Sequence, residues 1–466
     1  MNGRLSALDD SFLAVESDSA HMHVGWASTF RPPEHGPAPS FGELRDHIAS
    51  RLARAPRYRQ RIARVPFGLN APIWVDDELF DVNRHVVASS ATSLVELVDS
   101  CMSTQLRRDR PLWQICIAER MDDGRVGVVG KVHHCMVDGI AAVELGSLLL
   151  DPTPSPPPEK PDGWLPGSPP GPAQRLIGGV VDRILEGASL ARFPARLARS
   201  PGRVADLVEP ARRARKALAH SMRPSEPQEP VNQPITGARH LAWFSRPLAD
   251  LKRIGRPFDA SVNDVLLAAS AGGMRRFLQD RDREPMPLKT MVPVNVREGD
   301  ATDLGNRISF VFVDLPCDEP DPVRRLQNVR FDMSERKEEG MPEGGDAVMA
   351  AIRYIPRAAQ HAISRKIASP RTFNITVSNI PGPREPMYMR GCELEAAYPV
   401  VPIADDYAVS IGMTTVRDKA CFGLYAASDP LPDSDRLAEA VNGSIDELLE
   451  VATENRITSA PVAWQA

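Results

Sequence analysis

The residues with the clearest chemical potential lie in one short stretch, KVHHCMVDGIAA at positions 131–142. His133 and His134 stand side by side there, and Asp138 and Gly139 follow shortly after them. A neutral imidazole near pH 7 can take a proton from a hydroxyl group whose oxygen attacks a carbonyl carbon, and can then return it to the leaving group. The stretch could therefore carry general-base catalysis.

Two other interpretations compete with catalysis. Neighbouring side chains on a strand point to opposite faces, so adjacent histidines rarely bind one metal ion, and no Cys/His cluster elsewhere in the sequence would complete a four-ligand zinc site. A histidine pair at the end of a strand is also often ordinary, hydrogen-bonded packing. If the pair is catalytic, the lack of a G-x-S-x-G elbow or a cysteine-nucleophile signature favours direct attack over a covalent acyl-enzyme. The local residues leave packing and catalysis open.

The stretch lies where a strand gives way to a helix. Residues 125–134 read RVGVVGKVHH, a valine-rich run after the turn signal MDDG, which predicts a buried strand. The apolar spacing in IAAVELGSLLL, residues 140–150, predicts a helix packed on a sheet, and Asp138 stands where the N-cap of that helix would be. We therefore expect the histidines at the end of a strand, in a strand–loop–helix junction.

The whole chain suggests two domains. Its 466 residues are too many for one ordinary core, and strands alternate with helices in both halves, so we expect an α/β (α+β) protein with mixed sheets. We place an N-terminal domain at residues 1–151, a connector at 152–236 and a C-terminal domain at 237–466. The connector begins with a stretch, 152–172, in which ten of 21 residues are proline, which is typical of a stiff, extended linker.

Composition excludes some classes of function. A formal net charge of −5 argues against a nucleic-acid-binding protein, and no apolar run approaches the roughly 18–20 residues that span a bilayer. The N-terminus lacks the apolar core of a signal peptide, so we expect a cytoplasmic protein with reduced cysteines.

Residues 173–224 hold eleven Arg and Lys against four Asp and Glu. This excess suits either solvated helices or a basic surface that binds anionic lipid, at the inner face of the plasma membrane or on lipid droplets.

Several motifs together resemble a known family. HHCMVDG matches the HHxxxDG signature of the coenzyme-A-dependent acyltransferase superfamily, which includes chloramphenicol and carnitine acyltransferases and peptide-synthetase condensation domains. Further stretches resemble the bacterial wax ester synthase/diacylglycerol acyltransferase family: LDDSFLAVES and HMHVGW at 8–26, APIWVDDELFDVNRHV at 71–86, RPLWQ at 110–114, VNDVLLA at 262–268, and VPVNVR, LGNRISFVFVDLP and VSNIPGP further on. The resemblance covers nearly the full length and is weakest at 183–223.

The resemblance implies a fold and a set of roles. The fold would be two similar chloramphenicol-acetyltransferase-like domains side by side, with an interdomain channel that has the histidine motif near its middle. His134 would be the general base, and His133 would support it. Asp138 would be structural, and Gly139 would let the loop turn. Asn263 of the ND motif would be either a donor to the oxyanion or the cap of the helix that it opens.

The implied reaction moves a long-chain acyl group from acyl-CoA, as co-substrate, to the hydroxyl of diacylglycerol or of a fatty alcohol. The products would be triacylglycerol and wax esters, and no bound cofactor or metal would be needed. Two alternatives remain: a condensation-type acyltransferase that uses carrier-bound acyl groups, and a non-catalytic lipid-binding paralogue. The lack of a carrier domain in the chain and the intact motif argue against them. For the PLW segment, core packing competes with a role along the acyl path. For the SNIPGP segment, an ordinary turn competes with a role along the CoA path.

Overall fold

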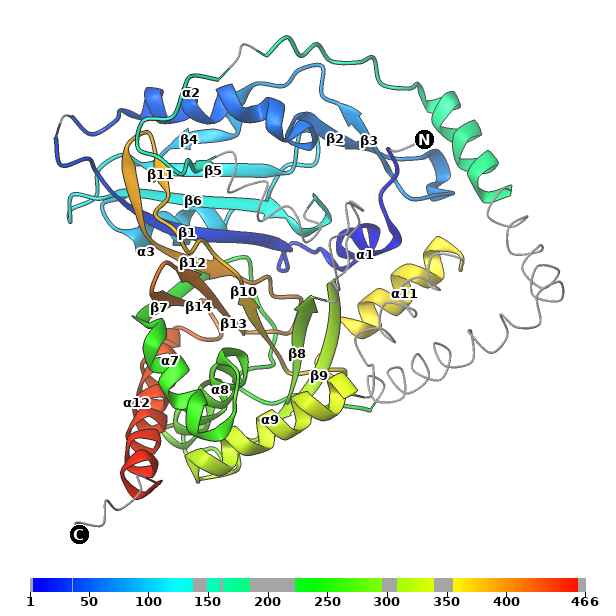
Figure 1. Ribbon diagram of the computed structural model, residues 1–466. Coiled ribbons are helices and arrows are strands. Elements are labelled where there is room, and N and C mark those ends of the chain that lie inside the picture. Colours follow the sequence, from blue (N-terminus) through cyan, green and yellow to red (C-terminus); the bar gives the residue numbers. More distant parts are fainter. Residues whose placement is uncertain are drawn as a thin grey trace, which may run out of the picture.

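Two six-stranded mixed sheets form the frame of the protein in a computed structural model (Figure 1). The structure describes residues 3–35, 37–136, 149–159, 162–184, 223–295, 308–338 and 355–459. The first sheet has the order β11-β12-β1-β6-β5-β4, and the second has the order β7-β14-β13-β10-β8-β9. Parallel pairs (β4–β5, β8–β10 and β10–β13) occur beside antiparallel ones, so the expected mixed sheets are confirmed.

The strands have the following bounds. In the first sheet they are β1 (His23–Arg31), β4 (Val86–Ala88), β5 (Trp113–Ala118), β6 (Val126–His133), β11 (Tyr388–Met389) and β12 (Cys392–Val400). In the second sheet they are β7 (Arg239–Pro247), β8 (Leu288–Asn295), β9 (Ile308–Leu315), β10 (Ile375–Ile380), β13 (Val409–Val416) and β14 (Lys419–Ala427). A separate two-stranded ribbon is formed by β2 (Gln60–Ala63) and β3 (Ile73–Asp76).

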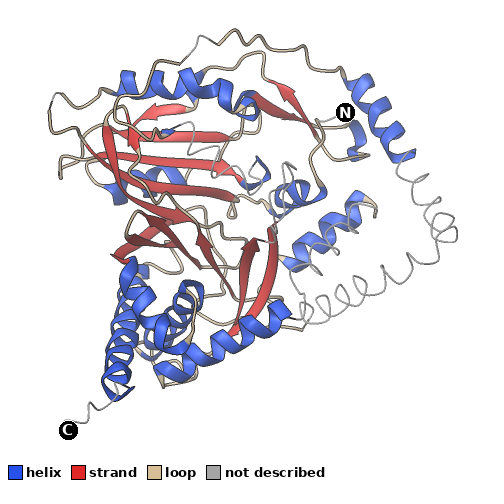
Figure 2. Ribbon diagram, viewed as in Figure 1, coloured by secondary structure: helices blue, strands red, loops and turns tan. Residues whose placement is uncertain are grey.

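Helices surround these sheets (Figure 2). In the N-terminal half they are α1 (Ala7–Val15), α2 (Phe41–Arg51) and α3 (Leu94–Met102), and a further helix occupies residues 172–184. In the C-terminal half they are α7 (Leu248–Gly255), α8 (Val262–Gln279), α9 (Pro322–Glu338), α11 (Arg357–Ile367) and α12 (Ser434–Ser459). Short 3₁₀ turns include η3 (Pro66–Gly68) and η5 (His134–Met136). Within the described residues, none of the helices has the length and apolar character to cross a bilayer.

The strand β6 carries the histidine stretch into the centre of the first sheet. All eight of its residues are buried, as the valine-rich run predicts. It pairs with β1 on one side and β5 on the other. A Cβ atom on Gly130 would lie 2.1 Å from the ring of Trp26 on β1, so only glycine lets that indole lie across the strand. The strand ends at His133, one residue earlier than expected, because His134 begins the turn η5.

The C-terminal half of the chain contributes two strands to the first sheet. β12 and β11 come from the C-terminal half of the sequence, yet β12 pairs antiparallel with β1 and completes the first sheet. β12 alternates buried and partly exposed residues along most of its length, which is the pattern of a strand with one face in a core. Residues 392–400 therefore belong spatially with the N-terminal sheet, and the two halves are joined by a continuous core.

The helix α8 begins with the ND motif. Ser261 is its N-cap and accepts a hydrogen bond from the backbone N–H of Asp264, while the Asp264 carboxylate accepts one from the N–H of Ser261. Such a reciprocal cap contributes about 1 kcal/mol to helix stability. The alternative that Asn263 caps this helix is therefore wrong: Asn263 is the second residue of the helix, and Ser261 is the N-cap.

The proline-rich connector is fixed to the surface of the N-terminal half by an aromatic anchor. Trp164 packs edge-on against Phe80, with ring centroids 6.3 Å apart, and the guanidinium of Arg59 lies 4.9 Å above its ring. Arg59 also forms an ion pair with Asp162. The connector then reaches the helix at 172–184, which lies beside the β2–β3 ribbon (Figure 1).

Candidate active site

His134 lies immediately after β6, where one contact holds its backbone and another holds its ring. Its backbone N–H donates a hydrogen bond to the carbonyl of Met22, at 2.9 Å. Its ring stacks on Phe12 of α1, with centroids 3.6 Å apart and planes inclined by 16°. Met22 has a φ of 50°, a left-handed conformation that is uncommon for a residue with a side chain. The turn at Met22 thus holds the backbone of His134, and the Phe12 ring packs on its imidazole.

His133 is buried and hydrogen-bonded in a way that defines its tautomer. Its Nδ1 accepts a hydrogen bond from the backbone N–H of Cys135, at 3.1 Å, so in the neutral ring the proton is on Nε2. Nε2 lies 3.5 Å from a carboxylate oxygen of Glu16, and Arg108 forms an ion pair with the same oxygen. Glu16 follows α1 directly, so this helix contacts both histidines.

Both histidines are neutral at physiological pH. Burial lowers the pKa of His133 to about 3, and the nearby positive charge of Arg108 adds to that shift. Burial also lowers the pKa of His134 to about 4, against the opposing effect of its own backbone carbonyl and with a small contribution from His133. The Nδ1 atom of His134 is buried and has no hydrogen-bond partner on another described residue. Nε2 is therefore the candidate nitrogen for proton transfer.

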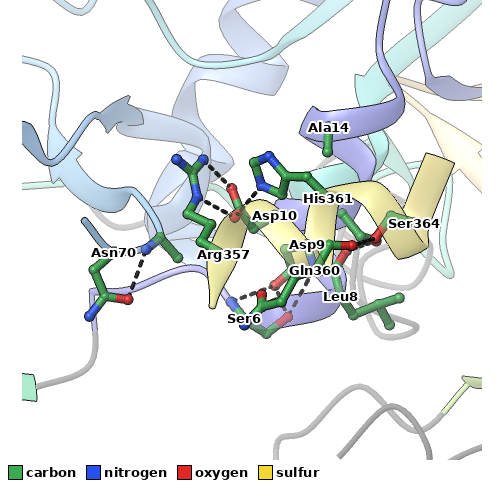
Figure 3. A network of polar contacts seen from close by, with 12 residues as sticks. Ser6, Leu8, Asp9, Asp10, Ala14, Asn70, Arg357, Gln360, His361 and Ser364 are labelled. Carbon is green, nitrogen blue, oxygen red and sulfur yellow. Dashed lines mark hydrogen bonds and ion pairs between the residues drawn. The ribbon is translucent and has the colours of Figure 1, made fainter. Parts of the chain in front are cut away.

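The helix α1 is tied to the C-terminal half through Asp10 (Figure 3). The Asp10 side chain is fully buried and accepts two hydrogen bonds from Arg357, at 2.6 and 2.8 Å. His361 Nε2, one helical turn further along α11, lies 2.8 Å from the same carboxylate. Burial alone would raise the pKa of Asp10, but the bonds to Arg357 and His361 outweigh it and lower that pKa. At the other end of α1, Arg365 donates to the carbonyl of Ala14.

Two clefts open on either side of Glu16 and Ser17. One, of about 430 Å³, is lined by residues 16–18 and 105–108. The other, of about 400 Å³, lies between the two halves of the chain, with residues 14–17 on one wall and residues 365, 368–370 and 405–406 on the other. The end of α1 therefore separates two solvent-accessible spaces, both lined by Glu16, which faces His133.

The remaining predicted site residues have different outcomes. Asp138 and Gly139 lie outside the described residues, as does the helix expected from Ile140. Asn263 is partly exposed at the start of α8, and no hydrogen bond or ring contact among the described residues joins it to His134. No group of three or more potential metal ligands occurs in the described part of the chain.

The PLW and SNIPGP segments have roles in packing. Trp113 is buried, stacks on His85 and donates its indole N–H to the carbonyl of Tyr58, at 2.8 Å, which confirms core packing for PLW. Gly382 of SNIPGP lies against β13, where a Cβ atom would be 1.9 Å from the backbone oxygen of Thr415. Glycine is therefore required there by close backbone approach.

Sequence reasoning missed the contribution of α1. Its residues Asp10, Phe12 and Glu16 contact α11, His134 and His133, respectively. A signal was present: the helix opens with a Ser6–Asp9 capping box, and an acid in the midst of LDDSFLAV would be buried and in need of a partner. The partner could not be identified, because Arg357 is 347 residues away.

Comparison with known proteins gives consistent matches along the chain. The family model described as the wax ester synthase/diacylglycerol acyltransferase catalytic domain matches residues 5–266, and that of the WS/DGAT C-terminal domain matches residues 304–449. A protein of Mycobacterium tuberculosis, named as a candidate diacylglycerol O-acyltransferase, is 31% identical over 465 positions that cover 97% of each chain. Another of the same organism and designation is 30% identical, with 94% of this chain and 97% of that protein covered.

Solved structures show the same fold. A wax ester synthase/diacylglycerol acyltransferase from Marinobacter aquaeolei VT8 superposes with a TM-score of 0.69 at 26% identity, covering 97% of this chain and all of that one. The starter condensation domain of rhizomide synthetase superposes with a TM-score of 0.57 at 14% identity, covering 97% and 94% of the two chains, which is a likeness of fold alone. The expected two-domain acyltransferase architecture is confirmed by these matches.

Proposed function

The chain belongs to the wax ester synthase/diacylglycerol acyltransferase family, and we propose that it transfers a long-chain acyl group from acyl-CoA to the hydroxyl of diacylglycerol. The product is then triacylglycerol. Fatty alcohols are further acceptors and give wax esters. The names of the Mycobacterium and Marinobacter relatives support this substrate class.

His134 is the general base of the proposed reaction. Its Nε2 takes the hydroxyl proton while the acceptor oxygen forms a bond to the thioester carbonyl carbon. The carbon–sulfur bond then breaks, and the proton passes from His134 to the departing sulfur, so that CoA leaves as a thiol. A base that exchanges one proton in this way contributes about 10²–10⁴-fold to the rate.

The observation that carries the proposal is the state of His134. Its imidazole is neutral, because burial lowers its pKa to about 4, and the ring stacks on Phe12 while the backbone N–H is bonded to the Met22 carbonyl. Nδ1 is buried without a partner on another described residue, and we assign the lone pair of Nε2 to the substrate hydroxyl. A neutral imidazole with a packed ring is the state that general-base catalysis requires.

The other residues support this base. His133, hydrogen-bonded to Cys135 and facing Glu16, fixes the backbone on which His134 is mounted. Asp138 orients the following loop, and Gly139 lets it turn. Asn263 donates to the oxyanion that forms on the thioester carbonyl, an interaction that contributes about 3–4 kcal/mol where such donors are preorganised.

Substrates reach His134 through the interdomain space. Two clefts meet at Glu16 and Ser17, and we assign one to acyl-CoA and the other to the lipid acceptor. Because the acceptor is insoluble, the protein works as a peripheral enzyme on a membrane or a lipid droplet. The excess of basic residues in 173–224 is consistent with that location.

The test is product analysis with purified protein. Palmitoyl-CoA is supplied with diacylglycerol, with hexadecanol or with both, and the lipids are separated while thiol release is followed. Triacylglycerol should form and its formation should be lost in His134→Ala. The matched control is His35→Ala, which removes an exposed histidine. No thiol release with either acceptor would reject the proposed reaction, and hexadecanol esters alone would reject diacylglycerol as the acceptor.

A further inference from the structure

The helix at residues 172–184 turns an apolar stripe towards solvent. Its members lie three or four residues apart from one helical turn to the next, and all are exposed: Ile177 (64%), Val180, Val181 and Ile184 (64%). In a globular protein such a stripe normally faces the core. Here the side in contact with the protein is formed by Gly179, whose carbonyl accepts a hydrogen bond from Asn70.

A loop of the N-terminal half extends this apolar surface. In the turn η3, Phe67 is 90% exposed and has a φ of 58°, a left-handed conformation that costs energy in a residue with a side chain. Leu69 follows and is 46% exposed. The loop contacts the helix, because Arg183 donates to the carbonyl of Leu69 and Val65 packs beside Gly179. We call Phe67, Leu69, Ile177, Val180, Val181 and Ile184 the apolar patch.

Basic side chains accompany the apolar patch. Residues 64–70 and 172–184 contain three arginines, Arg64, Arg175 and Arg183, and a single acid, Asp182. Arg4 neutralises Asp182 through an ion pair at 2.6 Å. Neither Arg64 nor Arg175 has a carboxylate partner among the described residues. An apolar surface with an uncompensated positive charge fits the interface of an anionic phospholipid layer, where side chains enter the acyl boundary and guanidinium groups remain with the phosphates.

We propose that the apolar patch is the surface by which this protein docks on an anionic phospholipid bilayer. The lipid nature of the partner rests on the proposed function, because an enzyme that esterifies diacylglycerol must take its acceptor from such a layer. The patch also lies close to the site. A Cβ atom on Gly68 would be 3.5 Å from the Arg357 guanidinium, which holds Asp10 on the helix that carries Phe12. Docking there brings the bilayer beside α1 and α11.

Co-sedimentation with vesicles tests the proposal without turnover. The full chain is compared with a variant that carries Phe67→Ser, Ile177→Ser and Ile184→Ser, three exposed side chains whose loss leaves the core intact. The matched control is Phe331→Ser, on α9, where the ring is 68% exposed and lies away from the patch (Figure 1). We expect the triple variant to bind mixed phosphatidylcholine/phosphatidylglycerol vesicles at least about tenfold more weakly, because each inserted side chain contributes apolar transfer free energy. The control should bind like the wild type.

Three further readouts decide between occupants. The indole fluorescence of a Phe67→Trp variant should be quenched by brominated lipid in anionic vesicles and less so in vesicles of phosphatidylcholine alone. The triple variant should keep its turnover of soluble dioctanoylglycerol and lose that of long-chain diacylglycerol held in vesicles. Equal binding by all variants, or an unquenched indole in the Phe67→Trp variant, would overturn the proposal. So would a change in oligomeric state of the triple variant in lipid-free solution, since the patch would then join two copies of the chain. None of these outcomes bears on His134, whose variant should still bind vesicles.

Discussion

Replacing Asp10 by Asn tests whether the link between α1 and α11 holds the catalytic histidine in place. The carboxylate is 1% exposed and receives two hydrogen bonds from Arg357 and one from His361. Breaking a fully buried ion pair costs about 3–5 kcal/mol. Because Arg357 and His361 keep 23% and 20% of their side-chain surface, solvent recovers part of that cost, and we expect a loss of about 2–3 kcal/mol in the free energy of unfolding.

Loss of the Asp10 link should also lower the catalytic rate, and Phe12 connects the two effects. A loosened α1 no longer fixes the ring on which His134 stacks, so kcat should fall by about tenfold or more while the KM for acyl-CoA changes little, as expected when geometry rather than binding is lost. Urea unfolding and initial rates measure the two effects, with Asp46→Asn, a carboxylate 70% exposed in a surface ion pair, as the control.

A double-mutant cycle with Arg357→Gln separates the contact from general damage. The two residues should be coupled by about 1–3 kcal/mol, since they share one hydrogen-bond network. If Asp10→Asn unfolds at the same urea concentration as the wild type and keeps its kcat, the Asp10 link does not position the site and this reasoning fails.

Three more predictions follow from the geometry of the site. The value of kcat/KM should stay level between pH 8 and 5 and fall below that with an apparent pKa of about 4, because His134 must be neutral to accept a proton. A fall in kcat/KM already near pH 6.5, measured in short assays, would show that burial does not lower the pKa of His134. The free energy of unfolding should fall as pH drops from 6.5 towards 4, because His134 binds a proton in the unfolded chain but stays neutral in the folded one. His134→Gln should flatten this slope by up to about 1.4 kcal/mol per pH unit. Parallel slopes for the two proteins in urea titrations would contradict the lowered pKa of His134. Gly382→Ala should lower the midpoint of thermal unfolding by the equivalent of about 1–3 kcal/mol, since its Cβ meets the Thr415 oxygen, whereas Gly163→Ala, with nothing within 4 Å, should be neutral.

Local pattern predicted the strand that carries the histidine pair. The valine-rich run at 125–134 forms β6, because periodicity and turn signals act over a few residues. The end of β6 was one residue off, since the change from strand to η5 depends on the Met22 carbonyl that receives the His134 amide. That carbonyl belongs to a strained turn more than a hundred residues away in sequence.

The parts that sequence could not reveal depend on distant partners. β12 shows clear alternation, but nothing in its residues says that it pairs with β1 rather than with the second sheet. Likewise, Phe12 and Glu16 look like ordinary helix residues until the fold brings them to the histidine pair. Motif resemblance pointed to His134, whereas only the structure shows that α1 packs Phe12 on its imidazole ring.

The most direct test of the central claim is the steady-state rate of His134→Ala beside His35→Ala and the wild type. Thiol release from palmitoyl-CoA is followed with saturating diacylglycerol, and circular dichroism checks that each variant is folded. Removal of the general base should lower kcat/KM by at least about 10²-fold, while the exposed-histidine control stays at the wild-type value. A folded His134→Ala protein that retains kcat/KM within a factor of about three would contradict the assignment of His134 as the base.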